Sequence, residues 1–237
     1  MYQIHLITFA NKEPFLKGQQ ILDSTYKNGN ISTHTMWNQY KIYETEFYEK
    51  NKYIIETYKS IGFGLFIWKP YIILEKLHEI DYGEFIYYQD SSRYDFTGIT
   101  CNIQPVCKYM ELNNLELLPG FLINICNKIL IKSECIKYMG YYNNQDFLNK
   151  LHYQTSPMII KKTPQTIKFI KEWLQYCIIP ECIIKNVSYH QCDQAIFNIL
   201  LDKYNYKGLI YTDSKVESKL YSNYWNKLLE HINSSNI

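Results

Sequence analysis

Residues 62–94 read GFGLFIWKPYIILEKLHEIDYGEFIYYQDSSRY, and this segment sets the expected architecture. A turn with two glycines precedes a helix predicted over Pro70–Ile80, because proline is favoured at the first helical position. The apolar run Glu84–Gln89 then predicts a buried strand, which leads directly into the acidic turn at Asp90. A helix that leads into a buried strand in this way is typical of one unit of an α/β sheet.

The flanking residues continue the alternation of strands and helices. The near-continuous apolar run Tyr2–Phe9 predicts a buried parallel strand. The other predicted elements are a short strand after residue 30, the strand Met158–Lys161, and the helices Pro14–Tyr26, Tyr43–Lys59, Thr166–Cys177 and Asp193–Tyr204. Residues 97–151 give no clear pattern. We therefore expect an α/β fold with a mixed, mostly parallel sheet flanked by helices. The site should lie beyond the carboxyl ends of the strands.

Composition limits the classes of function. The chain has 237 residues, 46% of them hydrophobic, which is enough for a large core. Its net charge of +2 gives no basic stripe for nucleic acid. The seven cysteines form no CxxC pair, which argues against a zinc framework or a disulfide scaffold. With no predicted signal peptide or membrane-spanning segment, we expect a cytoplasmic protein.

Two cationic side chains flank the predicted strand Glu84–Gln89. Lys69 precedes Pro70, where the free amides of a helix start favour an anion such as phosphate. Arg93 is the only arginine beside 24 lysines, and its planar fork suits phosphate or carboxylate. The alternative is a solvated lysine beside a core tryptophan, Trp68, with Arg93 in a surface ion pair.

The acidic turn Asp90-Ser91-Ser92 is a candidate metal site. A carboxylate at a strand end, followed by hydroxyls, offers oxygen ligands to a hard divalent cation. The alternative is an Asx-turn that ends the strand.

Two later segments carry further candidates. His190 comes shortly before Asp193-Gln194, where the carboxylate lies at a predicted helix start; the alternative role for Asp193 is a helix N-cap. Residues 152–156, which include Gln154 and Ser156, lead directly into the strand Met158–Lys161. They suit hydrogen bonds to a hydroxylated ligand or form an ordinary loop.

The order of these motifs resembles glycosyltransferases of the GT-A type, the group that includes glycogenin and bacterial lipopolysaccharide galactosyltransferases. It is most similar to uncharacterised members in large DNA viruses and bacteria, which have a Gly-x-Gly-x-x-x-Trp-Lys-Pro turn before an acidic motif; here that turn is Gly62–Pro70. The family's Asp-x-Asp motif matches Asp90-Ser91-Ser92, with Ser92 in place of the second Asp. The C-terminal metal motif of the glycogenin group is not found here.

The resemblance implies one GT-A-like domain over residues 1–237, with 1–100 as the nucleotide-binding half and 101–237 as the sugar and acceptor half. It implies Mn²⁺ or Mg²⁺ at Asp90 and Ser92, and a nucleotide sugar donor such as a UDP-sugar. The implied nucleotide and diphosphate contacts are Thr8, Phe9, Ala10, Asn11, Trp68, Lys69 and Arg93. The implied sugar contacts are Gln154, Ser156 and His190, with Asp193 and Gln194 as catalytic residues.

The expected activity is transfer of a sugar to a hydroxyl of a glycan or protein, with retention of stereochemistry if the likeness to glycogenin holds. A GT-A-like binding protein without catalysis is the alternative, favoured by Ser92 and by the missing C-terminal motif. We expect no nucleic-acid partner, and the sequence does not indicate an oligomeric state.

Overall fold

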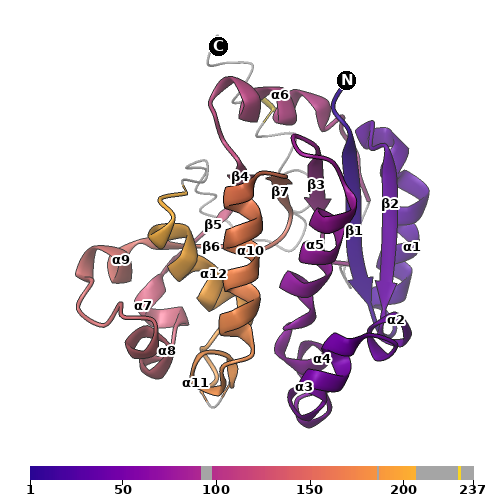
Figure 1. Ribbon diagram of the computed structural model, residues 1–237. Coiled ribbons are helices and arrows are strands. Elements are labelled where there is room, and N and C mark those ends of the chain that lie inside the picture. The colour runs from indigo at the N-terminus through magenta and orange to yellow at the C-terminus, as the bar shows by residue number, and fades with distance from the viewer. Residues whose placement is uncertain (92–97, 186, 207–228, 231–237) are drawn as a thin grey trace.

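The structure is a computed structural model that describes residues 1–91, 98–185, 187–206 and 229–230. Its centre is a five-stranded sheet in the order β2-β1-β3-β7-β4 (Figure 1). The strands are β1 (Ile4–Ala10), β2 (Thr33–Asn38), β3 (Phe85–Tyr88), β4 (Leu117–Leu118) and β7 (Met158–Lys161). The strands β2, β1 and β3 are parallel, and β7 is antiparallel to both β3 and β4. The expected mixed, mostly parallel sheet is confirmed at this level.

Helices cover both faces of the sheet, because its strands are apolar on both sides. In β1, Ile7 and Phe9 join one core cluster, whereas Ile4 and Leu6 join the other. The first cluster is built with α3 (Glu46–Thr57), α5 (Trp68–Glu79), α10 (Pro164–Cys177) and α12 (Cys192–Lys203). The second is built with α1 (Phe15–Thr25) and α6 (Gln104–Leu112).

The remaining elements lie around this core. A short 3-10 helix, η1 (Tyr26–Gly29), follows α1. A second, two-stranded sheet pairs β5 (Leu122–Cys126) with β6 (Leu151–Tyr153) in antiparallel fashion. The short helices are α2 (Gln39–Tyr43), α4 (Gly62–Leu65), α7 (Asn127–Leu130), α8 (Ser133–Tyr138), α9 (Gln145–Asn149) and α11 (Pro180–Ile183). Within the described part of the chain, no helix is long and apolar enough to cross a membrane.

Most predicted elements are confirmed, with shifts at their ends, but two helix predictions need correction. The helix predicted over Tyr43–Lys59 begins later, as α3 at Glu46, and Tyr43 instead ends the separate helix α2. Thr45 separates them, because its extended backbone and its side chain, which accepts a hydrogen bond from the amide of Tyr48, cap a new helix start. The helix predicted to begin at Pro70 begins at Trp68. Proline is tolerated there because the first four amides of a helix have no partner within it.

Candidate functional site

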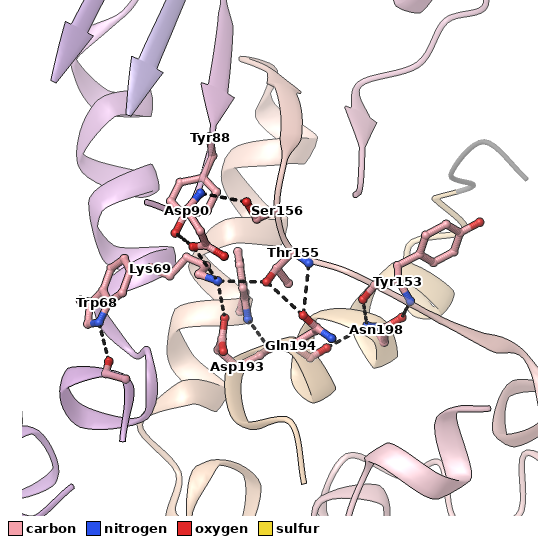
Figure 2. A network of polar contacts seen from close by, with 12 residues as sticks. Trp68, Lys69, Tyr88, Asp90, Tyr153, Thr155, Ser156, Asp193, Gln194 and Asn198 are labelled. Carbon is pink, nitrogen blue, oxygen red and sulfur yellow. Dashed lines mark hydrogen bonds and ion pairs between the residues drawn. The ribbon is translucent and has the colours of Figure 1, made fainter. Parts of the chain in front are cut away.

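The polar residues gather at one edge of the central sheet, where several chain segments meet. The parallel strands β1 and β3 end at this edge, with Asp90 shortly after β3. Because Tyr88 pairs with Met158 in the antiparallel strand β7, the residues just before β7 lie at the same edge. Figure 2 shows that Thr155 and Ser156, from that segment, face Asp90 and the start of α12. Segments far apart in sequence thus contribute to one cluster.

Lys69, on the first turn of α5, lies at the centre of this cluster. Its ammonium group is 3.4 Å from Oδ1 of Asp90 and 3.5 Å from Oδ2 of Asp193. It donates a hydrogen bond of 3.0 Å to Oγ1 of Thr155 (Figure 2). The side chains of Lys69 and Asp193 are each only 4% exposed, whereas that of Asp90 is 41% exposed. We call Lys69, Asp90 and Asp193 the charged cluster; it is open to solvent on the Asp90 side.

An unusual turn places Lys69. All five residues from Gly62 to Phe66 have positive φ angles, between 53° and 84°. Such a left-handed turn costs about 1–2 kcal/mol for each residue other than glycine. Gly64 is required for space as well, since a Cβ there would lie 2.7 Å from Cα of Ile55 in α3. The turn ends with the ring of Phe66 5.5 Å from the ammonium nitrogen of Lys69.

Trp68 and Phe9 fix the start of α5 against the end of β1. Their rings stack with centroids 4.0 Å apart, and both side chains are buried. The indole nitrogen of Trp68 donates a hydrogen bond of 2.8 Å to the carbonyl of Gly62 (Figure 2). These contacts hold α5, and therefore Lys69, at the sheet edge. They place the two predicted nucleotide contacts Phe9 and Trp68 in the core beside the charged cluster.

Burial is the largest influence on both buried charges. Burial lowers the pKa of Lys69, but the charges of Asp193 and Asp90 outweigh it, so the pKa is raised overall. For Asp193, burial raises the pKa to about 6, opposed by attraction to Lys69. Two carboxylates around one ammonium give the cluster a net negative charge when all three are ionised. Within the described residues, Oδ2 of Asp193 has no hydrogen-bond partner.

Asp90 is the side chain of the cluster that suits a divalent cation. Its backbone amide donates to Oγ of Ser156 at 2.8 Å, and its Oδ1 accepts the hydroxyl of Tyr88. These bonds orient a half-exposed carboxylate. Mg²⁺ is commonly held by one or two carboxylates together with substrate phosphates and water, so this donor set fits such an ion. Among the described residues there is no group of three His, Cys, Asp or Glu side chains arranged as metal ligands.

Gln194 lies on the other side of Thr155. Its Oε1 is 3.4 Å from the amide of Thr155 and 3.5 Å from the hydroxyl of Thr155, both at the outer limit of a hydrogen bond. The indole nitrogen of Trp173 donates to the carbonyl of Asp193 at 2.9 Å and anchors the start of α12. The structure therefore brings Asp193 and Gln194 together with Lys69, Asp90 and Ser156.

The other predicted site residues are not seen to contact the charged cluster, or they lie outside the described part of the chain. His190 is fully buried, and its ring nitrogens contact the carbonyl of Cys182 at 2.7 Å and the amide of Lys132 at 3.4 Å. Burial lowers its pKa to about 4, so it is a neutral core residue. Thr8 and Ala10 are buried and Asn11 is half-buried at the end of β1. Ser92 and Arg93 lie outside the described residues, so the predictions for them stay predictions.

Two members of the site were not singled out from the sequence. Thr155 receives the shortest contact of Lys69, and Tyr88 donates to Asp90. Their positions offered a signal: Thr155 lies between Gln154 and Ser156, two of the predicted sugar contacts, and Tyr88 is two residues before Asp90. Residues two apart in a strand share a face, so a polar tip at Tyr88 was placed to reach Asp90.

No protein-family model matches this chain, and no curated protein matches it significantly in sequence. The interpretation of the site therefore depends on its geometry and chemistry.

Proposed function

We propose that the protein is a GT-A-type glycosyltransferase that moves a sugar from a nucleoside diphosphate sugar, such as a UDP-sugar, to a hydroxyl of a glycan or protein. The observation that carries the proposal is the buried ammonium of Lys69 between Asp90 and Asp193, at the carboxyl end of a Rossmann-like sheet. Open α/β sheets bind ligands at this edge. Strongly perturbed, paired ionisable groups in such a place favour a functional role.

The chain's own cations would stabilise the leaving diphosphate. Lys69 lies beside Asp90, and Arg93 follows three residues after Asp90 in sequence. A Mn²⁺ or Mg²⁺ ion at Asp90 would supply Lewis-acid stabilisation of the diphosphate charge. Because the charged cluster is net negative, Lys69 alone cannot neutralise an added diphosphate. In the proposal, Arg93 therefore adds positive charge for the diphosphate, and the Asp90 carboxylate would hold the metal ion.

Asp193 and its neighbours would meet the sugar. Oδ2 of Asp193, which has no hydrogen-bond partner among the described residues but lies 3.5 Å from the ammonium of Lys69, is proposed to face the anomeric carbon, where positive charge develops in the transition state. Gln194, Gln154 and Ser156 would hold sugar hydroxyls. Ser156 accepts the amide of Asp90 and keeps its own hydroxyl hydrogen to donate. If Asp193 acts on the face that the likeness to glycogenin implies, transfer retains stereochemistry.

A second candidate function is donor binding without transfer. It is favoured by the burial of Asp193, whose side chain is 4% exposed and paired with Lys69. In this case a nucleotide sugar would occupy the open Asp90 side of the cluster and remain intact. The cytoplasmic location and the hydroxyl acceptor stay predictions in either case.

The test is release of nucleoside diphosphate from a panel of nucleotide sugars, with Mn²⁺ or Mg²⁺ and mixed hydroxyl acceptors. The wild type should turn over one donor, and Asp193→Asn should lower kcat at least about 100-fold with the fold intact. Asp146→Asn, at an exposed carboxylate in α9, is the matched control and should retain wild-type turnover. Donor binding without turnover would favour the second candidate. Equal turnover by Asp193→Asn and wild type would contradict the assignment of Asp193.

A further inference from the structure

One edge of β6 is covered by a side chain. At Tyr153 the backbone amide donates to Oδ1 of Asn198 at 2.8 Å, and the Tyr153 carbonyl accepts from Nδ2 of Asn198 at 2.9 Å (Figure 2). A carboxamide that makes both bonds to one residue copies the pairing of a neighbouring strand. Asn198 lies in the middle of α12, so it attaches that helix directly to the segment that leads to Thr155.

Behind Asn198 there is a chain of buried polar side chains. Nδ2 of Asn198 is 3.2 Å from Nε2 of His152, and Nδ1 of His152 is 2.7 Å from Oδ1 of Asn127. Nδ2 of Asn127 donates to the carbonyl of Phe147 at 3.1 Å. Burial is the main cause that lowers the pKa of His152 to about 3, so the ring is neutral. Each of its ring nitrogens lies within hydrogen-bond distance of a partner. We call Asn127, His152 and Asn198 the neutral network.

The neutral network reaches the charged cluster by two routes. Nδ2 of Asn198 also donates to the carbonyl of Gln194 at 2.9 Å, which fixes the first turn of α12 next to Asp193. Through Tyr153, Asn198 also holds the segment that places Thr155, the hydrogen-bond partner of Lys69.

The same segment is held on its other edge. The carbonyl of Gln154 accepts from Gly120 at 3.0 Å, and the amide of Gln154 donates to Phe121 at 3.0 Å. Gly120 permits this approach, since a Cβ there would lie 2.8 Å from the carbonyl oxygen of Ser156. In an extended chain the polar groups of successive residues face opposite edges, so Gln154 faces one side and Tyr153 faces Asn198. Asn198 thus supplies hydrogen bonds on the edge opposite to the one that Gly120 and Phe121 hold.

We propose that Asn198 is a positioning residue, which sets the distances between Thr155, Gln194 and Lys69 in the candidate site. The expected effect on kcat rests on the proposed function. The expected effect on the exposure of Lys69 rests on the geometry alone. It assigns a functional task to a residue that does not touch the substrate.

The test compares Asn198→Ala with Thr163→Ala, whose side chain caps α10 away from the site. For Asn198→Ala we expect kcat about 100-fold lower, with KM for the donor changed less than about threefold, since small misplacements of reacting groups have effects of this size. Thr163→Ala should leave both constants unchanged. A residue that only stabilises the fold would behave like Thr163.

A second readout does not depend on activity. Wild-type Lys69 should resist acetylation by an amine-reactive reagent, because its side chain is 4% exposed, whereas Lys50, at 73%, should react fully. We expect Asn198→Ala to increase acetylation of Lys69 at least about fivefold, and Thr163→Ala to leave Lys69 protected. Peptide mass spectrometry measures both lysines in one sample. Protection of Lys69 in Asn198→Ala equal to wild type would overturn the proposal.

The outcomes separate the two claims. If the wild type turns over no donor, the proposed function fails, and the acetylation of Lys69 still decides the role of Asn198. If the wild type transfers sugar and Asn198→Ala keeps its kcat, the positioning role fails while the function stands. Should Asn198→Ala not fold, His152→Phe keeps a ring of similar size but removes the ring nitrogen that lies 3.2 Å from Nδ2 of Asn198. It should show the same changes at smaller size, and wild-type behaviour there would overturn the proposal.

Discussion

Two polar groups of residues lie next to each other near the sheet edge, and they are built in opposite ways. The neutral network of Asn127, His152 and Asn198 carries no charge, and its hydrogen bonds are 2.7–3.2 Å long. The charged cluster of Lys69, Asp90 and Asp193 has ion pairs of 3.4 and 3.5 Å.

The two groups have different roles in the protein. A fully satisfied polar network rigidifies a core and contributes to a unique structure. Burying a carboxylate costs desolvation free energy, and an incomplete set of partners does not fully offset that cost. Such a buried ion pair is therefore weak evidence for a contribution to stability. The buried polar groups of the neutral network thus have hydrogen-bond partners, as a stable core requires, whereas the charged cluster buries charge with incomplete pairing. Sites that depart from such requirements are where function is expected.

The largest expected effect comes from removing the shared cation. Lys69→Met leaves two carboxylates without their buried counter-ion and should lower the free energy of unfolding by about 3–5 kcal/mol at pH 7. Adding Asp193→Asn removes one of these charges, so the double variant should be more stable than Lys69→Met alone. Urea unfolding measures both. A double variant less stable than Lys69→Met would show that Asp193 is not held in place by Lys69.

The next effect concerns the neutral network. Asn198→Ala removes the hydrogen bonds of Asn198 to the amide and carbonyl of Tyr153 and should lower the free energy of unfolding by about 3 kcal/mol. Unlike Lys69→Met, it should not be rescued by a change at Asp193, because no charge is involved. A loss below about 1 kcal/mol would mean that water replaces the side chain of Asn198 and that the network contributes little.

The two groups should respond to pH in opposite directions. Asp193 has a pKa raised to about 6 in the fold against 3.8 for the free group, so its stabilising contribution is present below pH 3.8 and is lost as pH rises through 6. His152 has a pKa lowered to about 3 from 6.5, so its contribution is present above pH 6.5 and is lost as pH falls towards 3.

Each group should therefore contribute a slope of about 1.4 kcal/mol per pH unit between pH 4 and 6, with opposite sign. Asp193→Asn should make stability fall more steeply towards acid, and His152→Phe should flatten that fall. Unfolding by urea at several pH values compares these variants with wild type. Parallel curves for all three proteins would contradict both assigned pKa values.

The smallest expected effect is that of Thr163→Ala. Loss of the α10 cap should lower the free energy of unfolding by about 1 kcal/mol, without a change in the pH slope. This variant sets the scale for a stability loss that reaches neither group. If Thr163→Ala changed the pH dependence of the free energy of unfolding, a changed slope in the other variants could not be assigned to Asp193 or His152.

Much of the fold could be predicted from the sequence. The strands are apolar on both faces, so Tyr2–Phe9, Glu84–Gln89 and Met158–Lys161 were visible as short apolar runs. Asp90 and Asp193 were visible too, since each carboxylate stands at the end or start of a predicted element. Lys69 directly precedes Pro70, and proline is favoured at the start of a helix, so the sequence placed this lysine at a helix start.

The rest depends on contacts between distant residues. The start of α5 is set by the stacking of Trp68 on Phe9, which no local pattern reports. His190 lies close to Asp193 in sequence, but the fold turns its ring towards Cys182 and Lys132. Asn198 lies inside the predicted helix Asp193–Tyr204 and was not singled out from the sequence, because its contacts follow only from the position of Tyr153.

The most direct test of the charged cluster as a donor site is the melting temperature of the wild type with a panel of nucleotide sugars, with and without Mn²⁺ or Mg²⁺. Asp90→Asn is the comparison, because its side chain is 41% exposed and its loss should disturb the fold least within the cluster. One donor with metal should raise the Tm of the wild type by about 5 °C at about 100 times its Kd, and should leave Asp90→Asn unshifted. No shift with any donor, or equal shifts in both proteins, would contradict the account.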